Sequence, residues 1–491
     1  MSDSLPRPKP ELTRDQRALL FERLRQKKGR SAGAPQRIPR RPSSGEPLPL
    51  SFAQERLWFL DRLLPGGTAY NIPLALRIEG DLAPALLAAA LREVVRRHEA
   101  LRTTFRERGG RPEQVIAPAG EWSLPWIDLT ALPAGPRAAE ARRLAQGEAE
   151  RPFDLERGPL LRAVLLRLAA GEHALLLAMH HIVSDGWSMG VLVREITALY
   201  TAGWRVGSSE DGAQLSEPGR ASLSTARSSI PPALPIQYAD FAVWQRGWLQ
   251  GERLAAQLGY WRRQLAGAPG ALELPADRPR PPAPSFRGAR VRFTLADAVA
   301  AGRLADLARR GDATPFMVLL AAFQVLLGRY SGKDDLLVGS PIANRNRPEL
   351  EPLIGFFVNT LVLRGDLAGD PAFGELVERA RATALGAYAH QDLPFERLVE
   401  ELRPERHLAR NPLFQVMLAL QNAPLGRVEL PGLTLAPLEF DAATAQFDLH
   451  LDVTEVAGEW TAELVYATDL FDAATVRRLA GGIERGRSAT V

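Results

Sequence analysis

The sequence predicts an α/β protein. Apolar runs of strand length alternate with longer segments of helical periodicity in both halves of the chain, and no short-period repeat is present. The chain has 491 residues, of which 46% are hydrophobic, so it can build large cores. Length alone suggests about three domains.

The clearest strand–turn–helix unit spans residues 173–200. The run Ala174–Met179 is uninterruptedly apolar and has the length of a buried strand. Two histidines follow, then three further residues, and then Asp185-Gly186. Asp-Gly is a turn dipeptide in which the glycine can adopt positive φ at little cost. Ser188 is then expected to cap a helix whose apolar residues recur at helical spacing, at Leu192, Ile196 and Leu199.

The pleat of a strand separates the two histidines, His180 and His181. Successive side chains point to opposite faces, so a strand through both would send one into packing and the other toward solvent or substrate. Two ordinary polar residues at a strand end are the plain alternative. A metal site is disfavoured because the chain has no cysteine and only five other histidines to supply further ligands.

Composition and charge narrow the functional class. The net charge is +4, but only four of the 61 basic residues are lysines, and the arginines are dispersed among 57 acidic residues. This pattern argues against nucleic-acid binding. The absence of cysteine excludes disulfides and a thiol nucleophile. No run reaches about eighteen apolar residues and no signal-peptide core is seen, so we expect a soluble, cytoplasmic protein with no membrane partner.

The first half of the chain divides into an arm and a lobe. Residues 1–46 are rich in Pro, Arg and Ser around one short helical pattern, which fits either a solvated helix or a docking helix for another protein. The first lobe is expected over residues 47–230, starting with a helix that Ser51 can cap. Residues 205–229 are expected to form an inserted mobile loop, because their Ser, Gly and charged composition cannot repay the entropy of ordering.

The second lobe is expected over residues 231–491. Its clearest elements are a helix over residues 314–329 and a buried strand over residues 335–339, followed by the polar segment SPIANRNR. The last helix is predicted over residues 477–483.

The string MHHIVSDGWS resembles the HHxxxDG signature of the condensation domains of nonribosomal peptide synthetases, which are chloramphenicol acetyltransferase-like acyltransferases. Further stretches resemble the other motifs of that family in the same order, so the resemblance covers residues 47–480: Ser51–Pro73, Arg97–Phe105, Leu234–Arg246, Ile354–Leu361, His390–Leu402 and Arg410–Asn422. It implies two acetyltransferase-like lobes in a V-shaped pseudo-dimer, with the active site in a channel between them.

The resemblance also implies roles for residues of the signature. His181 faces the channel and either takes the proton or holds the amine. The pleat of the strand then assigns His180 to the packing side. Asp185 pairs with an arginine; Arg345 is the preferred partner and Arg102 the alternative. Gly186 lets backbone approach the substrate, and its N–H or the helix start faces the developing oxyanion. Further residues are expected to line the channel: Trp187, Ser188 and Asn359.

The implied activity is peptide bond formation between a carrier-bound L-aminoacyl or L-peptidyl thioester and the amine of a carrier-bound aminoacyl acceptor. The flanking strings GWSMGVL and SFAQERLWFLD resemble the subtype that joins an L donor to an L acceptor, and the DxxxxD pattern of the cyclising variant is absent. The domain needs no cofactor of its own, since its substrates arrive as phosphopantetheine thioesters. Expected partners are the donor and acceptor carrier proteins and, through the N-terminal arm, an upstream synthetase subunit.

Two other functions remain open. One is a free-standing acyltransferase of the same superfamily that uses coenzyme A thioesters; the DFGWG-like motif of its plant-type members is missing near the C-terminus. The other is a non-catalytic module that recruits carrier proteins. Intact His181, Asp185 and Gly186 weigh against this second alternative.

Overall fold

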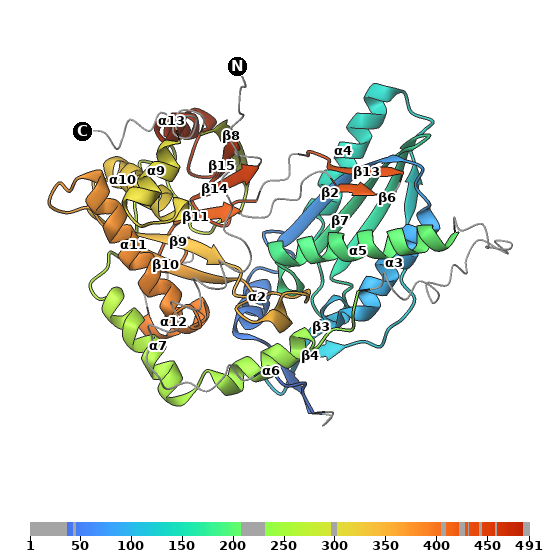
Figure 1. Cartoon of the computed structure of the whole chain (residues 1–491), viewed down its shortest axis with the longest axis horizontal. Helices are drawn as coiled ribbons and strands as arrows, with labels where there is room; N and C mark the ends of the chain where they lie inside the picture. Colours follow the sequence, from blue (N-terminus) through green and yellow to red (C-terminus); the bar gives the residue numbers. More distant parts are fainter. Residues whose placement is uncertain are drawn as a thin grey trace, which may run out of the picture. The chain divides into compact units, whose positions relative to one another are not determined.

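The computed structural model describes residues 37–42, 46–207, 231–295, 302–403, 409–421, 428–430, 432–440, 444–456 and 459–484 (Figure 1). The chain from Pro39 onward forms one compact unit. The helix predicted in the N-terminal arm lies outside the described residues. So does the predicted insertion, apart from its first three residues, which belong to helix α5.

The first half of the chain builds most of a six-stranded sheet with the order β12-β13-β2-β7-β6-β5. All neighbours are antiparallel except the pair β5–β6. The strands contributed by the first half are β2 (Asn71–Gly80), β5 (Trp126–Asp128), β6 (Leu161–Ala169) and β7 (Glu172–His180).

Helices cover both faces of this sheet. Helices α3 (Pro84–Arg97) and α5 (Gly186–Gly207) pack on the face that carries Leu175 and Leu177, and α4 (Ala134–Glu150) packs on the opposite face (Figure 1). Because β7 is buried on both faces, its sequence is a continuous apolar run rather than an alternating one.

A three-stranded sheet and helix α2 complete the first half. The sheet has the order β1-β4-β3 and consists of β1 (Leu48–Pro49), β4 (Arg111–Ile116) and β3 (Thr103–Arg108). Helix α2 (Phe52–Leu63) begins with the predicted cap: the Ser51 hydroxyl accepts the N–H of Gln54, whose side chain bonds back to the N–H of Ser51.

The second half builds another six-stranded sheet, with the order β10-β9-β11-β14-β15-β8. Its strands are β8 (Gly288–Thr294), β9 (Asp335–Ile342), β10 (Asn359–Asp366), β11 (Val416–Gln421), β14 (Leu449–Val456) and β15 (Glu459–Ala467). Its helices are α6 (Tyr238–Trp248), α7 (Gly251–Gln264), α9 (Arg303–Arg310), α10 (Pro315–Ser331), α11 (Phe373–Ala389), α12 (Phe395–Leu402) and α13 (Ala473–Glu484).

Helix α10 shows how closely local sequence determines this half. Thr314 caps it, Pro315 occupies its first turn, and Leu320, Phe323 and Leu327 lie in the core, as the periodicity predicts. The α/β class with two sheet-and-helix lobes is therefore confirmed.

Two strands from the second half join the first sheet. Strands β12 (Val428–Leu430) and β13 (Leu433–Pro437) form a hairpin, and β13 pairs with β2 in the register Leu435↔Ile78. The first sheet is thus completed by residues far along the chain. The lobe boundary at residues 230/231 stays a prediction. The β12–β13 hairpin follows this boundary in the sequence but belongs to the sheet of the first lobe.

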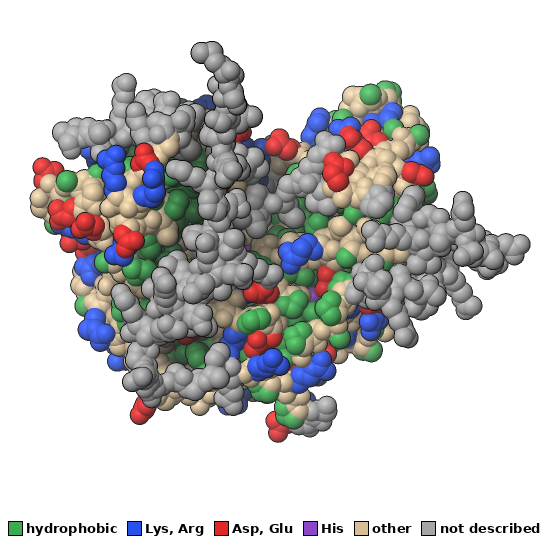
Figure 2. Space-filling model, in the orientation of Figure 1, with side chains coloured by type: hydrophobic (Ala, Val, Ile, Leu, Met, Phe, Trp, Pro, Cys, Tyr) green, Lys and Arg blue, Asp and Glu red, His purple; other side chains and the backbone are tan. Residues whose placement is uncertain are grey.

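Figure 2 shows charged side chains of both signs intermixed among the described residues on this face. Among the described residues, no single helix is long and apolar enough to cross a membrane. The helices Leu304–Arg310 and Pro315–Ser331 pass that test only together, and they are bent by 102° at the break between them.

Candidate functional site

The first strand of interest, β7, ends at His180. His181 begins a short 3-10 helix, His181–Val183, so the strand does not run through both histidines. The argument from the pleat therefore has the wrong premise. The two side chains nevertheless have different surroundings, because the chain turns between them.

His180 is a packed side chain with only 3% of its surface exposed. Its ring meets Phe153 edge-on at 5.9 Å, and its Nδ1 accepts the N–H of Ile182 at 3.2 Å. Burial, with smaller contributions from His181 and Arg162, lowers the pKa of His180 to about 3. His180 is consequently neutral and holds the start of the 3-10 helix.

His181 is half-buried, and its backbone N–H donates to the carbonyl of Tyr70 at 2.8 Å. Its ring lies 4.7 Å from that of Phe356, edge to face. Burial lowers the pKa of His181, while the carboxylate of Asp185 opposes this shift. Its Nδ1 is buried without a hydrogen-bond partner among the described residues. At neutral pH the imidazole is therefore uncharged and able to accept a proton.

Asp185 is fully buried and caps helix α5. Its Oδ1 accepts the N–H of Ser188 at 2.8 Å and the Ser188 hydroxyl at 2.7 Å, and its carbonyl accepts the N–H of Met189 at 3.1 Å. The prediction that Ser188 caps this helix is wrong, since the helix begins at Gly186. Gly186 does not use the freedom of a glycine to adopt positive φ, because it is the first residue of the helix.

Arg345 lies against Asp185, from the segment that follows β9. Its Nη2 is 3.1 Å from Asp185 Oδ1, and its Nη1 donates to the carbonyls of Leu350 and Leu353 at 2.5 and 2.7 Å. Burial lowers the pKa of Arg345, and Asp185 acts in the opposite direction. The pair is buried, with 2% of the Arg345 side chain and 0% of the Asp185 side chain exposed. Removing either partner therefore leaves the other as an unpaired buried charge.

Arg102 is not brought to Asp185. Its guanidinium donates to the carbonyls of Ala117 and Arg96 instead. Those contacts connect the end of α3 to the strand pair β3–β4, so Arg102 stabilises the fold and does not pair with Asp185.

Residues 354–357, here called the 354–357 strip, are held by side-chain hydrogen bonds that sequence reasoning missed. Asp185 and Ser188 of the HHxxxDG region, His98 and Tyr238 provide them. Each residue of the strip takes part through its backbone, which leaves no mark on the strip's own sequence. The bonds join Ile354 N to His98 Nδ1 (3.2 Å), Gly355 N to Ser188 Oγ (3.1 Å), Tyr238 OH to the Phe356 carbonyl (2.7 Å) and Phe357 N to Asp185 Oδ2 (3.0 Å).

His98 extends this attachment to helix α5. Since its Nδ1 accepts the N–H of Ile354, its Nε2 carries the proton and donates to Glu195 at 3.0 Å. Burial raises the pKa of Glu195, but hydrogen bonds from His98 and Arg97 outweigh it and lower the pKa overall. Glu195 is therefore a paired carboxylate, and His98 joins the two halves of the chain.

Of the remaining predicted site residues, Gly186 and Trp187 are exposed, whereas Ser188 and Asn359 are buried. Gly186 is exposed with open space around it, and Trp187 is 40% exposed while its Nε1 donates to the Glu351 carbonyl at 2.9 Å. Ser188 is fully buried. Asn359 is also buried: its amide donates to the carbonyls of Gln391 and Leu393, and its oxygen accepts two backbone N–H groups. Ser188 and Asn359 thus have no free polar atom to offer a substrate.

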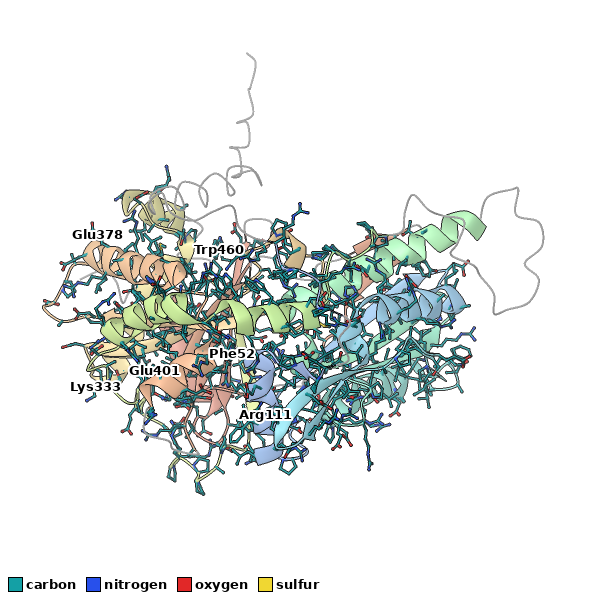
Figure 3. All side chains as sticks on the ribbon, turned by 90° about the horizontal axis from the view of Figure 1, so that it is seen from below. Phe52, Arg111, Lys333, Glu378, Glu401 and Trp460 are labelled. Atoms are coloured by element: carbon teal, nitrogen blue, oxygen red, sulfur yellow. The ribbon has the colours of Figure 1, made fainter. Side chains whose placement is uncertain are left out.

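A groove of about 670 Å³ lies near this site, although neither His181 nor the 354–357 strip is among the residues that line it. It reaches Tyr70, whose carbonyl receives the N–H of His181. Phe52, the first residue of α2, lies at the junction of the elements of the two halves in Figure 3. Both halves line the groove, including Phe52, Arg56, Phe59, Leu63, Arg280, Phe286, Phe395, Glu396, Pro412, Phe447 and Asp448. Among the described residues, no three of His, Asp and Glu gather in a way that could hold a metal ion.

The sequence profile of the Condensation domain family matches residues 45–214 and 223–485, nearly the whole chain. The protein belongs to the condensation domain family.

Similar sequences occur as segments of large synthetases. A linear gramicidin synthase chain of Brevibacillus parabrevis is 50% identical over 437 residues, 88% of this chain and 5% of that protein. Phosphinothricin tripeptide synthetase PhsC of Streptomyces viridochromogenes is 46% identical over 472 residues, 95% of this chain and 41% of that protein. The chain thus spans a minor part of these relatives. Among solved structures, the X-domain from teicoplanin biosynthesis superposes with a TM-score of 0.79 at 31% identity, covering 92% of this chain and 96% of that one.

Proposed function

We propose that this chain forms a peptide bond between a carrier-bound L-aminoacyl or L-peptidyl thioester and the α-amine of a carrier-bound aminoacyl acceptor. The observation that carries the proposal is His181, a neutral imidazole whose backbone N–H bonds to Tyr70, one of the residues that line a groove formed by both halves of a condensation domain. The amine nitrogen bonds to the thioester carbon, the carbon–sulfur bond breaks, and the thiol of the donor arm leaves with a proton. The nitrogen of the tetrahedral intermediate is an ammonium, and it loses one proton before the amide is complete. The thiolate that leaves gains one proton, so the reaction balances.

This reaction asks little of the protein beyond alignment and proton handling. The thioester is already activated, and an α-amine with a pKa near 8 is partly free base at neutral pH. Alignment of the two reactants can lower the barrier by about 7–11 kcal/mol, and one well-placed base typically adds about 10²–10⁴-fold. His181 can take the proton or hold the amine by a hydrogen bond, and both roles require the uncharged ring. Gly186 is proposed to present its N–H to the developing oxyanion, which its exposed position at the start of α5 supports.

The substrates are proposed to arrive as phosphopantetheine thioesters on carrier proteins. Tethering supplies an effective concentration that a free thioester lacks. The relatives that carry similar segments are peptide synthetases, which supports carriers as partners. We propose further that the N-terminal arm contacts an upstream synthetase subunit and that the protein works in the cytoplasm.

Mass spectrometry of the acceptor carrier tests the proposal. Both carriers are loaded with L-amino acids and mixed with the protein. A mass gain on the acceptor that disappears in His181→Ala is expected. No such gain across several L donors and acceptors would exclude peptide bond formation, and efficient transfer from free coenzyme A thioesters would point to the coenzyme A-dependent acyltransferase instead. A D-configured donor that reacts as well as its L form would contradict the L–L subtype.

A further inference from the structure

A chain of neutral hydrogen bonds runs around His181 and uses none of the charged groups described above. The N–H of Gln54 donates to Ser51 Oγ at 3.1 Å, Ser51 Oγ lies 2.8 Å from Tyr238 OH, and Tyr238 OH lies 2.7 Å from the Phe356 carbonyl. A carbonyl can only accept, so Tyr238 gives its proton to Phe356 and receives the proton of Ser51. Gln54, Ser51 and Tyr238 are called the clamp below.

Both ends of the clamp hold groups that touch His181. At one end, Gln54 Nε2 donates to the carbonyl of Ile182, the residue directly after His181, at 3.1 Å. At the other end, Tyr238 holds the backbone of Phe356, whose ring lies 4.7 Å from the ring of His181. The clamp therefore fixes the backbone after His181 from helix α2 and the ring against it from helix α6.

Tyr238 itself is held tightly. Its ring meets Phe357 edge-on at 4.9 Å, and a Cβ placed on Gly355 would come within 2.0 Å of it, so only a glycine lets the strip lie this close. Burial raises the pKa of Tyr238, which keeps the phenol protonated as a donor across the neutral range. The hydroxyl thus has one acceptor and one position.

We propose that Tyr238, supported by Ser51 and Gln54, is a positioning residue for the reaction: it fixes the Phe356 ring against the His181 imidazole and so sets the orientation and the dryness of that imidazole. The inference rests on the proposed function. It adds a role for the residues around His181 that the HHxxxDG signature does not contain.

The physical consequence is a rigid, water-poor imidazole. A 1 Å misplacement of a reacting group can cost about 10²-fold in rate. Water admitted beside the ring would also favour the charged form and raise the pKa of His181. The charged and titratable groups that act on this ring are Asp185 at the start of α5, His180 on β7 and Arg56 on α2, whose own partner is Glu396 at 3.5 Å. None of them changes when the Tyr238 hydroxyl is removed.

The test is Tyr238→Phe, which deletes one oxygen and keeps the packed ring. With both loaded carriers, kcat is expected to fall about tenfold or more while KM changes less than about twofold. The acid limb of the kcat profile should move to higher pH. NMR titration of histidine-labelled protein, assigned with His181→Ala, should show a raised pKa for His181.

The matched control is Tyr200→Phe. It removes the hydroxyl of another buried tyrosine, and that hydroxyl accepts the N–H of Ala83 at 2.9 Å. It should leave both readouts unchanged.

Parental kcat together with a parental pKa for His181 in Tyr238→Phe would overturn the proposal. So would equal losses in Tyr238→Phe and Tyr200→Phe, because any buried hydroxyl would then have the same effect. If the parent protein shows no turnover, the proposed function fails, while the NMR titration still decides whether Tyr238 positions His181.

Discussion

Strands β7 and β9 are inner strands of their respective sheets, and the loops that follow them meet. The end of β7 and the loop after it carry three ionisable side chains, His180, His181 and Asp185, and the loop continues directly into helix α5. The loop after β9 contributes one buried cation, Arg345, and then the 354–357 strip, which takes part through backbone groups. His181 therefore carries the chemistry, while His180, Asp185 and the groups of the second loop form the frame around it. Damage to the frame should appear as lost stability, and damage to His181 as lost rate.

The largest effect on stability is expected from Asp185→Ala. The change strands the Arg345 cation, removes the cap of α5 and frees the N–H of Phe357. Breaking a buried pair costs about 3–5 kcal/mol. Urea unfolding of the variant and of Asp185→Asn, which retains the shape, should show that loss for alanine and part of it for asparagine. A variant as stable as the parent but inactive would instead make Asp185 a direct participant in the reaction.

The free energy of unfolding should depend on pH because the pKa of buried His180 is lowered in the folded chain. His180 has a pKa of about 3 in the folded chain and near 6.5 when unfolded, so the unfolded chain binds more protons between these values. Its contribution to stability is complete above about pH 6.5 and is lost as the pH falls toward 3, by at most about 1.4 kcal/mol per pH unit.

His180→Gln removes that titration and should flatten the stability curve between pH 6.5 and 4 in urea unfolding. The curve should not become fully flat, because His181 also has a lowered pKa and contributes with the same sign. An unchanged slope would show that His180 is not desolvated as described.

A smaller loss is expected at the second attachment of the strip. His98→Ala removes the acceptor for the N–H of Ile354 and a donor to Glu195. A buried polar group left unsatisfied costs about 1–3 kcal/mol, so a loss in that range is predicted from thermal or urea unfolding. Arg96→Ala, which breaks an exposed pair with Glu93 on the same helix, is the control and should change stability by less than about 1 kcal/mol. Equal effects of the two changes would contradict a buried junction at His98.

The smallest change in stability is expected for Gly186→Ala. A Cβ there meets nothing within 4 Å and the residue is already helical, so the free energy of unfolding should change by less than about 0.5 kcal/mol. The rate of peptide formation should fall about tenfold or more if backbone approach at Gly186 matters for the substrate. A fully active variant would remove Gly186 from the proposed site.

Features coded by neighbouring residues could be predicted from the sequence. The cap at Ser51, the helix after Thr314 and the strand before His180 follow from side chains that lie a few residues apart. The partner of Asp185 could be named as Arg345 only because a family resemblance supplied the idea of an arginine, and the structure pairs the two residues.

The attachment of the 354–357 strip could not be predicted in the same way. His98, Ser188 and Tyr238 bond to backbone atoms more than 100 residues away, and a backbone atom carries no residue identity to detect. Asn359 was misplaced for a related reason: a polar residue beside a channel motif and one that holds a buried loop have the same sequence pattern. The β12–β13 hairpin joins the first sheet through backbone pairing, and the sequence likewise carries no signal that identifies this partner strand.

The division between chemistry and frame is tested most directly by measuring the rate and the stability of the same two preparations, His181→Ala and His180→Ala. Single-turnover condensation of loaded carriers gives the rate, and urea unfolding at pH 7 gives the free energy. His181→Ala should lose about 10²–10⁴-fold in rate with little change in stability, as removal of a base does. His180→Ala should lose about 1–3 kcal/mol, because a packed ring and the acceptor for the N–H of Ile182 are removed. The opposite assignment of the two effects would contradict the account.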